Sequence, residues 1–307
     1  MWPPFVLVLY MGWKTVIIGC ESVVSLSQNR IRISVDDDYH LIPINDIDTV
    51  IFTHDKMRIT IPLIVKLMEN NVNIVICDSK NNPIGTFNCF NGHSLVFKHL
   101  KKQIDWRCVR KKKLWKNIID NKIQTEIDIL ELLNKDKEVI RSLKELKSEI
   151  KNDDQTNREA IAARIYFCEL FGNEFRRDDA TITNHALDYG YKIIASYISK
   201  CLVSRGYLTQ LGIHHIGESN PFNLTYDFIE PFRAIIDAWV YCNIKNKFLS
   251  EEKQQIVQIL EYKVFVNNKW FRISDAIEDV IDSYIAFLND ENDTIISLDL
   301  SKGIRDD

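Results

Sequence analysis

Short β-branched runs fill the first third of the chain, and this pattern restricts the fold more than any other feature. "WKTVIIG", "SVVSL", "RIRISV", "TVIF" and "NIVICD" are separated by turn-forming residues. "SQNR" and "DSKNNPIG" fit hairpin turns, and "ITIPLIVKLMENN" fits one short helix. The sequence therefore predicts a small β-rich domain over residues 11–92.

From about Ser94 the apolar residues recur at helical spacing, through "LKKQIDWRCVRKKKLWKNIIDNKI", "EIDILELL" and "VIRSLKELKSEI". The exception is "KVFVNNKWFRIS", which is expected to form a hairpin with the Asn-Asn pair as its turn. We therefore expect an α+β fold, in which a larger, mainly α-helical domain (93–293) follows the β-rich domain. Residues 294–307 form a tail without a clear packing signal.

Composition and termini place the chain among globular cytoplasmic proteins. The chain has 307 residues, is 46% hydrophobic and carries a net charge of -4, which does not by itself indicate a polyanionic partner. Seven cysteines without a C-x-x-C spacing indicate reduced, mostly buried thiols rather than a disulfide framework or a zinc site. Residues 1–10 are apolar but too few to span a membrane, so we interpret them as an extension ahead of a natural start at Met11.

One segment, Lys98 to Lys116, is strongly basic although the net charge of the whole chain is negative. It contains nine Lys or Arg residues and one acid, Asp105, with Trp106 and Trp115 between them. Such a concentration suits contacts with nucleic-acid phosphates, although a solvated helix face would produce the same pattern. The candidate DNA contacts are Lys101, Lys102, Arg110, Lys111, Lys112 and Lys113.

Glu159 is a candidate ligand in the helix expected from "REAIAARIYFCELF", with Asn157 as its N-cap. Ala162, Ala163 and Tyr166 continue its helix face, and small neighbours would leave room for an ion and a phosphate. An acid near a helix N-terminus also has an ordinary electrostatic explanation. Both interpretations of Glu159 remain open at this point.

Two histidines, His214 and His215, precede two acids, Asp227 and Glu230. A structural alternative is a capping box, with Asp227 at the N-cap and Glu230 at the third helical position. Capping does not explain the histidines. If a helix continued through the proline of "DFIEPFR", Asp237 would extend the same acidic stripe.

A carboxylate and an imidazole suit Mg²⁺ or Mn²⁺ when water and phosphate oxygen complete the coordination. One carboxylate and one imidazole alone are too few protein ligands to hold such an ion. Glu159 is the obvious third ligand, since facing helices commonly build one site.

The order of "EAIAARIYF", "NHALDYGY", "GIHH" and "DFIEPFRAIID" resembles the CRISPR-associated integrases of the spacer-acquisition module, the Cas1 family. The resemblance covers nearly the whole chain from Met11, and the "GWKT" opening is most similar to the type II subtype. It implies an N-terminal β domain and a helical domain that binds Mg²⁺ or Mn²⁺. Family members often carry an Asn-Gln pair where this chain has Thr125 and Glu126.

Matched motif by motif, the resemblance implies that the metal ligands and catalytic residues are Glu159, His215 and Glu230. His215 closes a Gly-x-x-His element that starts at Gly212. The resemblance also implies supporting roles for Asp227 and Asn184. Asn184 would either stabilise the local structure or contact the metal ligands without binding the metal itself.

The implied activity is the joining of the 3′-hydroxyl ends of a short spacer duplex to the CRISPR repeat, by phosphodiester transesterification, with related DNA endonuclease activity. The implied partners are double-stranded DNA, a second copy in a homodimer, a small ferredoxin-like protein (Cas2) and other type II adaptation proteins. Two alternatives remain: a non-catalytic DNA-binding scaffold whose acids serve as caps, and a metal-dependent nuclease unrelated to spacer acquisition.

Overall fold

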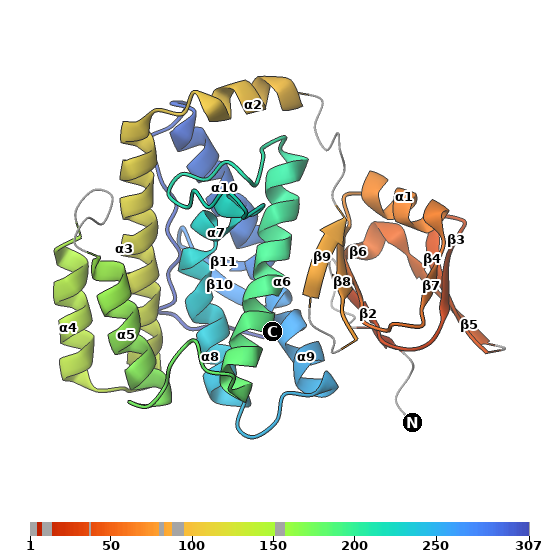
Figure 1. The fold of residues 1–307 in the computed structure, drawn as a ribbon, viewed down its shortest axis with the longest axis horizontal. Helices are drawn as coiled ribbons and strands as arrows, with labels where there is room; N and C mark the ends of the chain where they lie inside the picture. Colours follow the sequence, from red (N-terminus) through yellow and green to blue (C-terminus); the bar gives the residue numbers. More distant parts are fainter. Residues whose placement is uncertain are drawn as a thin grey trace.

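A β-rich region and a mainly helical region follow one another along the chain and lie side by side, which confirms the predicted α+β fold (Figure 1). The computed structural model describes residues 5–7, 14–36, 38–79, 83–87, 95–150 and 157–306. The predicted start, Met11, lies outside these residues.

Two sheets build the β-rich region. The five-stranded sheet has the order β1 (Phe5–Leu7), β2 (Lys14–Ile18), β6 (Ile47–Phe52), β8 (Asn73–Cys77) and β9 (Pro83–Phe87). The four-stranded sheet has the order β5 (Asp38–Pro43), β4 (Arg30–Val35), β3 (Val23–Ser27) and β7 (Arg58–Ile59). β2, β6 and β8 run parallel, whereas β1 and β9 pair antiparallel at the two edges of their sheet. All five predicted runs form strands, and β1, β5, β7 and β9 are additional.

Asparagine-containing turns close two hairpins as the sequence predicts. Gln28 and Asn29 join β3 to β4 with φ of 48° and 63°. Asn267 and Asn268 join β10 (Lys263–Val266) to β11 (Lys269–Arg272) with φ of 48° and 64°. These left-handed conformations match the twist of the paired strands, and asparagine adopts them readily. In "DSKNNPIG", β8 and β9 pair as expected, but residues 80–82 of the turn lie outside the described part.

Ten α-helices and three 3-10 helices are found among the described residues. The α-helices are α1 (Ile61–Glu69), α2 (Val96–Ile104), α3 (Cys108–Leu132), α4 (Lys137–Ser148), α5 (Arg158–Phe171), α6 (Ile182–Ser204), α7 (Asn223–Phe228), α8 (Arg233–Asn243), α9 (Ser250–Val257) and α10 (Ile273–Leu288). The 3-10 helices are η1 (Ile44–Asp46), η3 (Glu230–Phe232) and η4 (Gln258–Glu261). Over these residues no helix combines the length and the apolar character that a membrane span requires.

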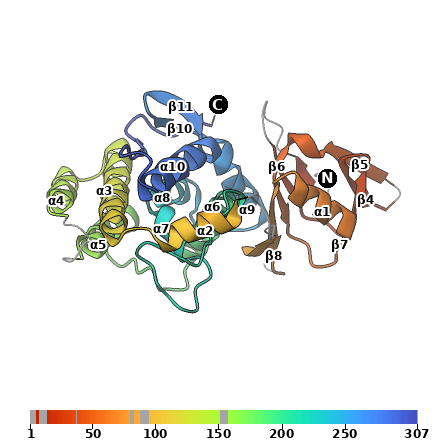
Figure 2. The same ribbon diagram turned by 90° about the horizontal axis from the view of Figure 1, so that it is seen from above.

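The 25-residue helix α3 is the central element of the helical region, because α4, α5, η3, α8 and α10 all contact it. α2 crosses one end of this region, as the two views show (Figure 1 and Figure 2). The basic segment is therefore two helices, α2 and α3, with a break between Ile104 and Cys108. Asn157 precedes α5 as predicted, but its backbone is left-handed (φ 52°) and its side chain makes no capping hydrogen bond.

Alternating residues of the five-stranded sheet belong to two different cores, as the two-residue period of a strand requires. Val16 and Val50 face the inside of the β-rich region. Ile17, Ile51 and Val75 join the core of the helical region, and β8 and β9 contact α6. The two predicted domains thus share a continuous apolar contact.

The expectation of a tail without packing was wrong for the described residues after 294. Leu298 and Leu300 are buried in the helical core. The Asn121 side chain donates to the Leu298 carbonyl (2.8 Å) and accepts from its N–H (2.9 Å). Two leucines with one residue between them give too short a pattern for a sequence to reveal, because their partners are distant in the chain.

The cysteines are free, but they are less buried than predicted. Among the six cysteines that the structure describes, all are unpaired and only Cys201 is buried. Cys108 and Cys242 are exposed. The prediction that most of the cysteines are buried is therefore wrong for these six residues.

Candidate active site

Two of the predicted ligands meet on a buried lysine. Glu159 lies in the first turn of α5 and Glu230 is the first residue of η3. Lys122, from the middle of α3, forms an ion pair with Glu159, and its Nζ lies 2.7 Å from Glu230 Oε2. The side chains of Lys122 and Glu230 are only 10% and 7% exposed. Three elements distant in sequence therefore converge where a positive charge sits between two glutamates.

The charges of this cluster stabilise one another. Burial alone would raise the pKa of Glu230, but Arg233 and Lys122 outweigh burial and lower this pKa to about 2. Arg233 donates from Nε to Glu230 Oε1 at 3.1 Å. Burial likewise opposes the charge on Lys122, but Glu230 and Glu159 raise the pKa of its ammonium group above the ordinary value. Glu230 and Lys122 are therefore both ionised at neutral pH.

His215 is held by Asp227, a fully buried carboxylate in α7. His215 Nδ1 lies 2.8 Å from Asp227 Oδ1, which also accepts from the His215 backbone N–H at 3.0 Å. The backbone N–H groups of Ile213 and His214 donate to the other oxygen, Oδ2. When Nδ1 carries the proton toward Asp227, Nε2 of the neutral ring keeps its lone pair. Asp227 thus presents His215 as a metal ligand requires.

The capping alternative for Asp227 was wrong, because this carboxylate serves the loop that carries the histidines. α7 begins at Asn223, so Asp227 lies within a helix rather than ahead of one. The continuous acidic stripe was wrong as well, since η3 separates α7 from α8. Asp237 is buried and accepts a hydrogen bond from the Tyr191 hydroxyl. Burial raises the pKa of Asp237 to about 6.

Gly212 explains the Gly-x-x-His spacing in steric terms. A Cβ atom added there would lie 2.3 Å from the His215 carbonyl oxygen and 2.7 Å from Asp227 Oδ2. Only glycine fits without displacing the histidine loop, defined here as residues 206–222.

We therefore expect Gly212→Ala to lower the free energy of unfolding by about 1–3 kcal/mol, the usual cost of overpacking. Urea unfolding measures this change. Gly85→Ala is the matched control, because no atom lies within 4 Å of its added Cβ. Equal stability of the two variants would show that the loop has room for a side chain.

His214 has a different environment from His215. Its ring stacks on Trp115 with the ring centres 4.0 Å apart and the planes 5° apart. Trp115 is buried, and Trp106 is also buried, with its Nε1 donating to Asn289. Both tryptophans of the basic segment are therefore core residues that support the loop and α10, not aromatic groups on an exposed surface.

Asn184 ties the start of α6 to the preceding loop. Its Nδ2 donates to the carbonyls of Arg176 (2.7 Å) and Asp179 (2.9 Å), and its Oδ1 accepts from Arg177. The Arg177 guanidinium lies over the Tyr191 ring, whose hydroxyl contacts Asp237. Asn184 is thus placed to support the buried polar network beside Arg233.

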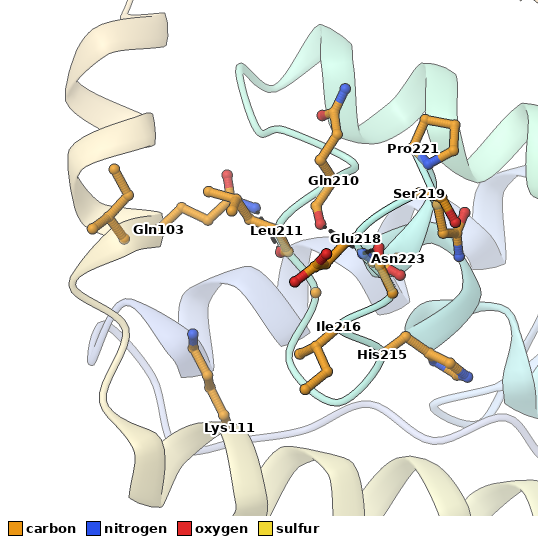
Figure 3. A pocket seen from close by; sticks show the side chains of 14 residues that line it. Gln103, Lys111, Gln210, Leu211, His215, Ile216, Glu218, Ser219, Pro221 and Asn223 are labelled. Carbon is orange, nitrogen blue, oxygen red and sulfur yellow. Dashed lines mark hydrogen bonds between the residues drawn. The ribbon is translucent and has the colours of Figure 1, made fainter.

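An open pocket of about 580 Å³ lies next to His215. The histidine loop forms one side, with Leu211, His215 and Ile216, while Lys111 from α3 and Gln103 from α2 lie on the other (Figure 3). His215 and Lys111 thus line the same open pocket from two different segments of the chain.

The predicted DNA contacts divide into two groups. Lys102 forms an ion pair with Glu291, and Arg110 forms ion pairs with Asp290 and Asp293, all in the turn after α10. The other four lie on α2 and the start of α3: Lys101 and Lys113 are exposed, and Lys111 and Lys112 are partly exposed. The intramolecular acids thus neutralise part of the basic segment.

The three predicted ligands do not gather around one point. Within the described ranges, no group of three His, Cys, Asp or Glu side chains is arranged to hold a metal ion. Instead, Lys122 lies between Glu159 and Glu230. Sequence reasoning missed Lys122 and Arg233. A lysine among the helically spaced isoleucines of "NIIDNKIQTEIDIL" was the available signal, since such a residue on a buried helix requires a partner.

Comparisons of the sequence and of the fold with known proteins point to the same family. The family model described as "CRISPR associated protein Cas1" matches residues 15–269. A protein of Neisseria meningitidis serogroup C (strain 8013), named CRISPR-associated endonuclease Cas1, is 32% identical over 287 residues, which are 92% of this chain and 94% of that protein.

Two solved structures share the fold. A casposase bound to integration product aligns with a TM-score of 0.71 at 20% identity, covering 92% of this chain and 91% of that chain. A Cas6-RT-Cas1–Cas2 complex aligns with a TM-score of 0.69 at 17% identity, covering 92% of this chain and 36% of that chain. The match of the family model to most of the sequence, together with this relative, shows that the chain belongs to the Cas1 family of CRISPR-associated proteins.

Proposed function

We propose that this protein is a metal-dependent DNA integrase of CRISPR adaptation, with related endonuclease activity. The observation that carries the proposal is the pairing of Glu159 and Glu230 around a buried positive charge, beside a histidine whose Nδ1 is held by Asp227. A scaffold needs neither feature. The reaction joins a 3′-hydroxyl of a spacer duplex to a repeat phosphodiester, and the 3′-oxygen of the repeat leaves.

The donor set fits Mg²⁺ or Mn²⁺. Two carboxylates and one imidazole are ligands that these ions accept, with water and phosphate oxygen for the rest. The buried ammonium between Glu159 and Glu230 supports a cation site there, and Nε2 of His215 would be the third donor. When bound, such an ion supplies activation of the attacking hydroxyl and stabilisation of the leaving oxygen.

The residues of this chain then position the reactants. Arg233 keeps Glu230 ionised, and Asp227 fixes the ring of His215. Lys111, across the pocket from the histidine loop, is placed to contact a phosphate of the incoming strand. Positioning and charge neutralisation are the main contributions that a protein makes to phosphoryl transfer.

The relatives support the same function and suggest partners. The Neisseria relative is named an endonuclease, and the casposase structure holds an integration product. The complex that contains Cas1 also contains Cas2, which supports a small ferredoxin-like Cas2 partner for this chain. We propose a homodimer as well, because joining both spacer ends to opposite strands requires two active sites at a fixed separation.

The test is an integration assay with a repeat-containing plasmid, a short duplex, the Cas2 partner and Mn²⁺. The proposal predicts covalent joining of the duplex to the repeat. Cleavage without joining would instead indicate a nuclease unrelated to spacer acquisition. Duplex binding without either reaction would indicate the scaffold.

Charge reversal of Lys111, Lys112 and Lys113 to glutamate is expected to weaken duplex binding across all sequences. Each lost phosphate contact reduces the slope of log affinity against log salt by about 0.9. The measurement is fluorescence anisotropy over a range of salt concentrations. Reversal of three exposed cations of α4, Lys137, Arg141 and Lys144, is the control and should leave the slope unchanged. Equal slopes for both variants would show that DNA binds to a surface other than the one that carries Lys111, Lys112 and Lys113.

A further inference from the structure

Glu126 is a buried carboxyl group that the proposed mechanism does not use. It lies on α3 one helical turn after Lys122 and is only 3% exposed. Within the described part of the chain, nothing donates a hydrogen bond to its buried Oε2 atom. Buried polar atoms without a partner are uncommon in native proteins, and an unpaired one calls for an explanation.

The position of Lys122 raises a second question. Its ammonium group lies between Glu159 and Glu230, where the proposed divalent ion would bind. A divalent ion bound through the same two carboxylate oxygens competes with the ammonium group for their lone pairs and repels its charge, so binding there favours displacement of the ammonium group. Lys122 is buried, and an ammonium group in an apolar interior is costly unless another acceptor receives it.

Helix geometry places Glu126 where such an acceptor is needed. Residues four apart on an α-helix lie on the same face, with Cβ atoms about 5–6 Å apart, within the reach of a lysine side chain. Burial raises the pKa of Glu126 to about 8 despite the nearby Lys122. In the metal-free state its carboxyl group is therefore neutral, and Glu159 and Glu230 share the lysine charge.

We propose that Lys122 is an internal counter-ion that holds Glu159 and Glu230 together without metal, and that, when metal binds, the Glu126 carboxyl group releases its proton to solvent and receives the ammonium group. The proposal rests on the proposed function, because it requires a divalent ion between the two glutamates. Lys122 and Glu126 are positioning residues, since they act through Glu159 and Glu230. The arrangement keeps two buried carboxylates compensated in both states.

The test is Mn²⁺ affinity of the full-length chain at pH 7, measured by electron paramagnetic resonance of free Mn²⁺. Glu126→Gln should weaken Mn²⁺ binding about ten-fold, because the displaced ammonium then lacks an ionisable acceptor. Lys122→Met should strengthen binding, since it removes the competing cation. In the Lys122→Met background, Glu126→Gln should have no further effect. Glu131→Gln, an exposed acid of the same helix, is the matched control and should leave the affinity unchanged.

The outcomes separate the two proposals. Glu126→Gln preserves side-chain shape, so its result stands even if Lys122→Met proves unstable. Unchanged Mn²⁺ affinity in Glu126→Gln would overturn the proposed movement of the Lys122 ammonium group to Glu126, while leaving the metal site intact. An undiminished loss in the double variant would also overturn it, because Glu126 would then act on the metal without Lys122. Absence of Mn²⁺ binding by the unmodified chain would overturn the proposed function and this inference with it.

Discussion

We expect His215→Ala to lower the rate of the proposed strand transfer about a hundred-fold or more, because the variant loses a proposed metal ligand rather than a packing contact. The ring is held through Nδ1 by Asp227 and lies beside the open pocket, which leaves Nε2 for coordination. The measurement is the initial rate of duplex joining at saturating Mn²⁺.

Duplex affinity and stability should change little in the same variant. The side chain of His215 is 41% exposed, and the loop keeps its three backbone hydrogen bonds to Asp227. Anisotropy with the spacer duplex and urea unfolding both check this expectation. A His215→Ala protein that joins DNA at the normal rate would remove His215 from the site and favour a different metal-ligand set.

Replacing Glu230 with glutamine will lower the free energy of unfolding by about 3–5 kcal/mol, as expected when one partner of a buried ion pair is removed. Glu230 is 6% exposed and contacts two cations, Lys122 and Arg233. The amide keeps the shape but not the charge, so both buried cations lose compensation. Urea unfolding in the presence of a chelator measures the loss without a contribution from metal.

A surface glutamate is the control for this effect. Glu145 pairs with Arg141 on α4, with both side chains well exposed. Glu145→Gln should change stability by less than about 0.5 kcal/mol, since exposed pairs contribute little. If the Glu230 and Glu145 variants were equally stable, the buried charges of Glu230, Lys122 and Arg233 would not stabilise one another as described above.

The stability difference should also depend on pH in a defined direction. The pKa of Glu230 is lowered to about 2 in the folded chain, so its carboxylate stabilises the fold above the ordinary pKa of about 4.5. That contribution is lost as pH falls from 4.5 toward 2. The gap between the unmodified chain and Glu230→Gln should therefore shrink as pH falls below 4.5.

The fold was predictable wherever periodicity and turn chemistry act locally. The short β-branched runs "TVIF" and "NIVICD" identified β6 and β8, and paired polar residues marked both hairpin turns. Packing between distant segments was not predictable. Leu298 looked unanchored because its hydrogen-bond partner, Asn121, lies far away in the sequence.

The candidate site divides in the same way. Family motifs pointed to Glu159, His215 and Glu230, and the steric need for Gly212 accounts for one of those motifs. The sequence alone did not reveal Lys122 and Glu126 as partners of the site, because charged residues on a helix are normally expected to face solvent. Only the burial of α3 against α5, η3 and α8 turns these charges inward.

The most direct test of the proposed site is a crystal structure of the chain grown with Mn²⁺, with the ion located by its anomalous scattering. We expect a peak bound by the carboxylates of Glu159 and Glu230 and by Nε2 of His215. A structure at saturating Mn²⁺ in which Lys122 still lies between the two glutamates, with no peak at that position, would contradict the proposed metal centre.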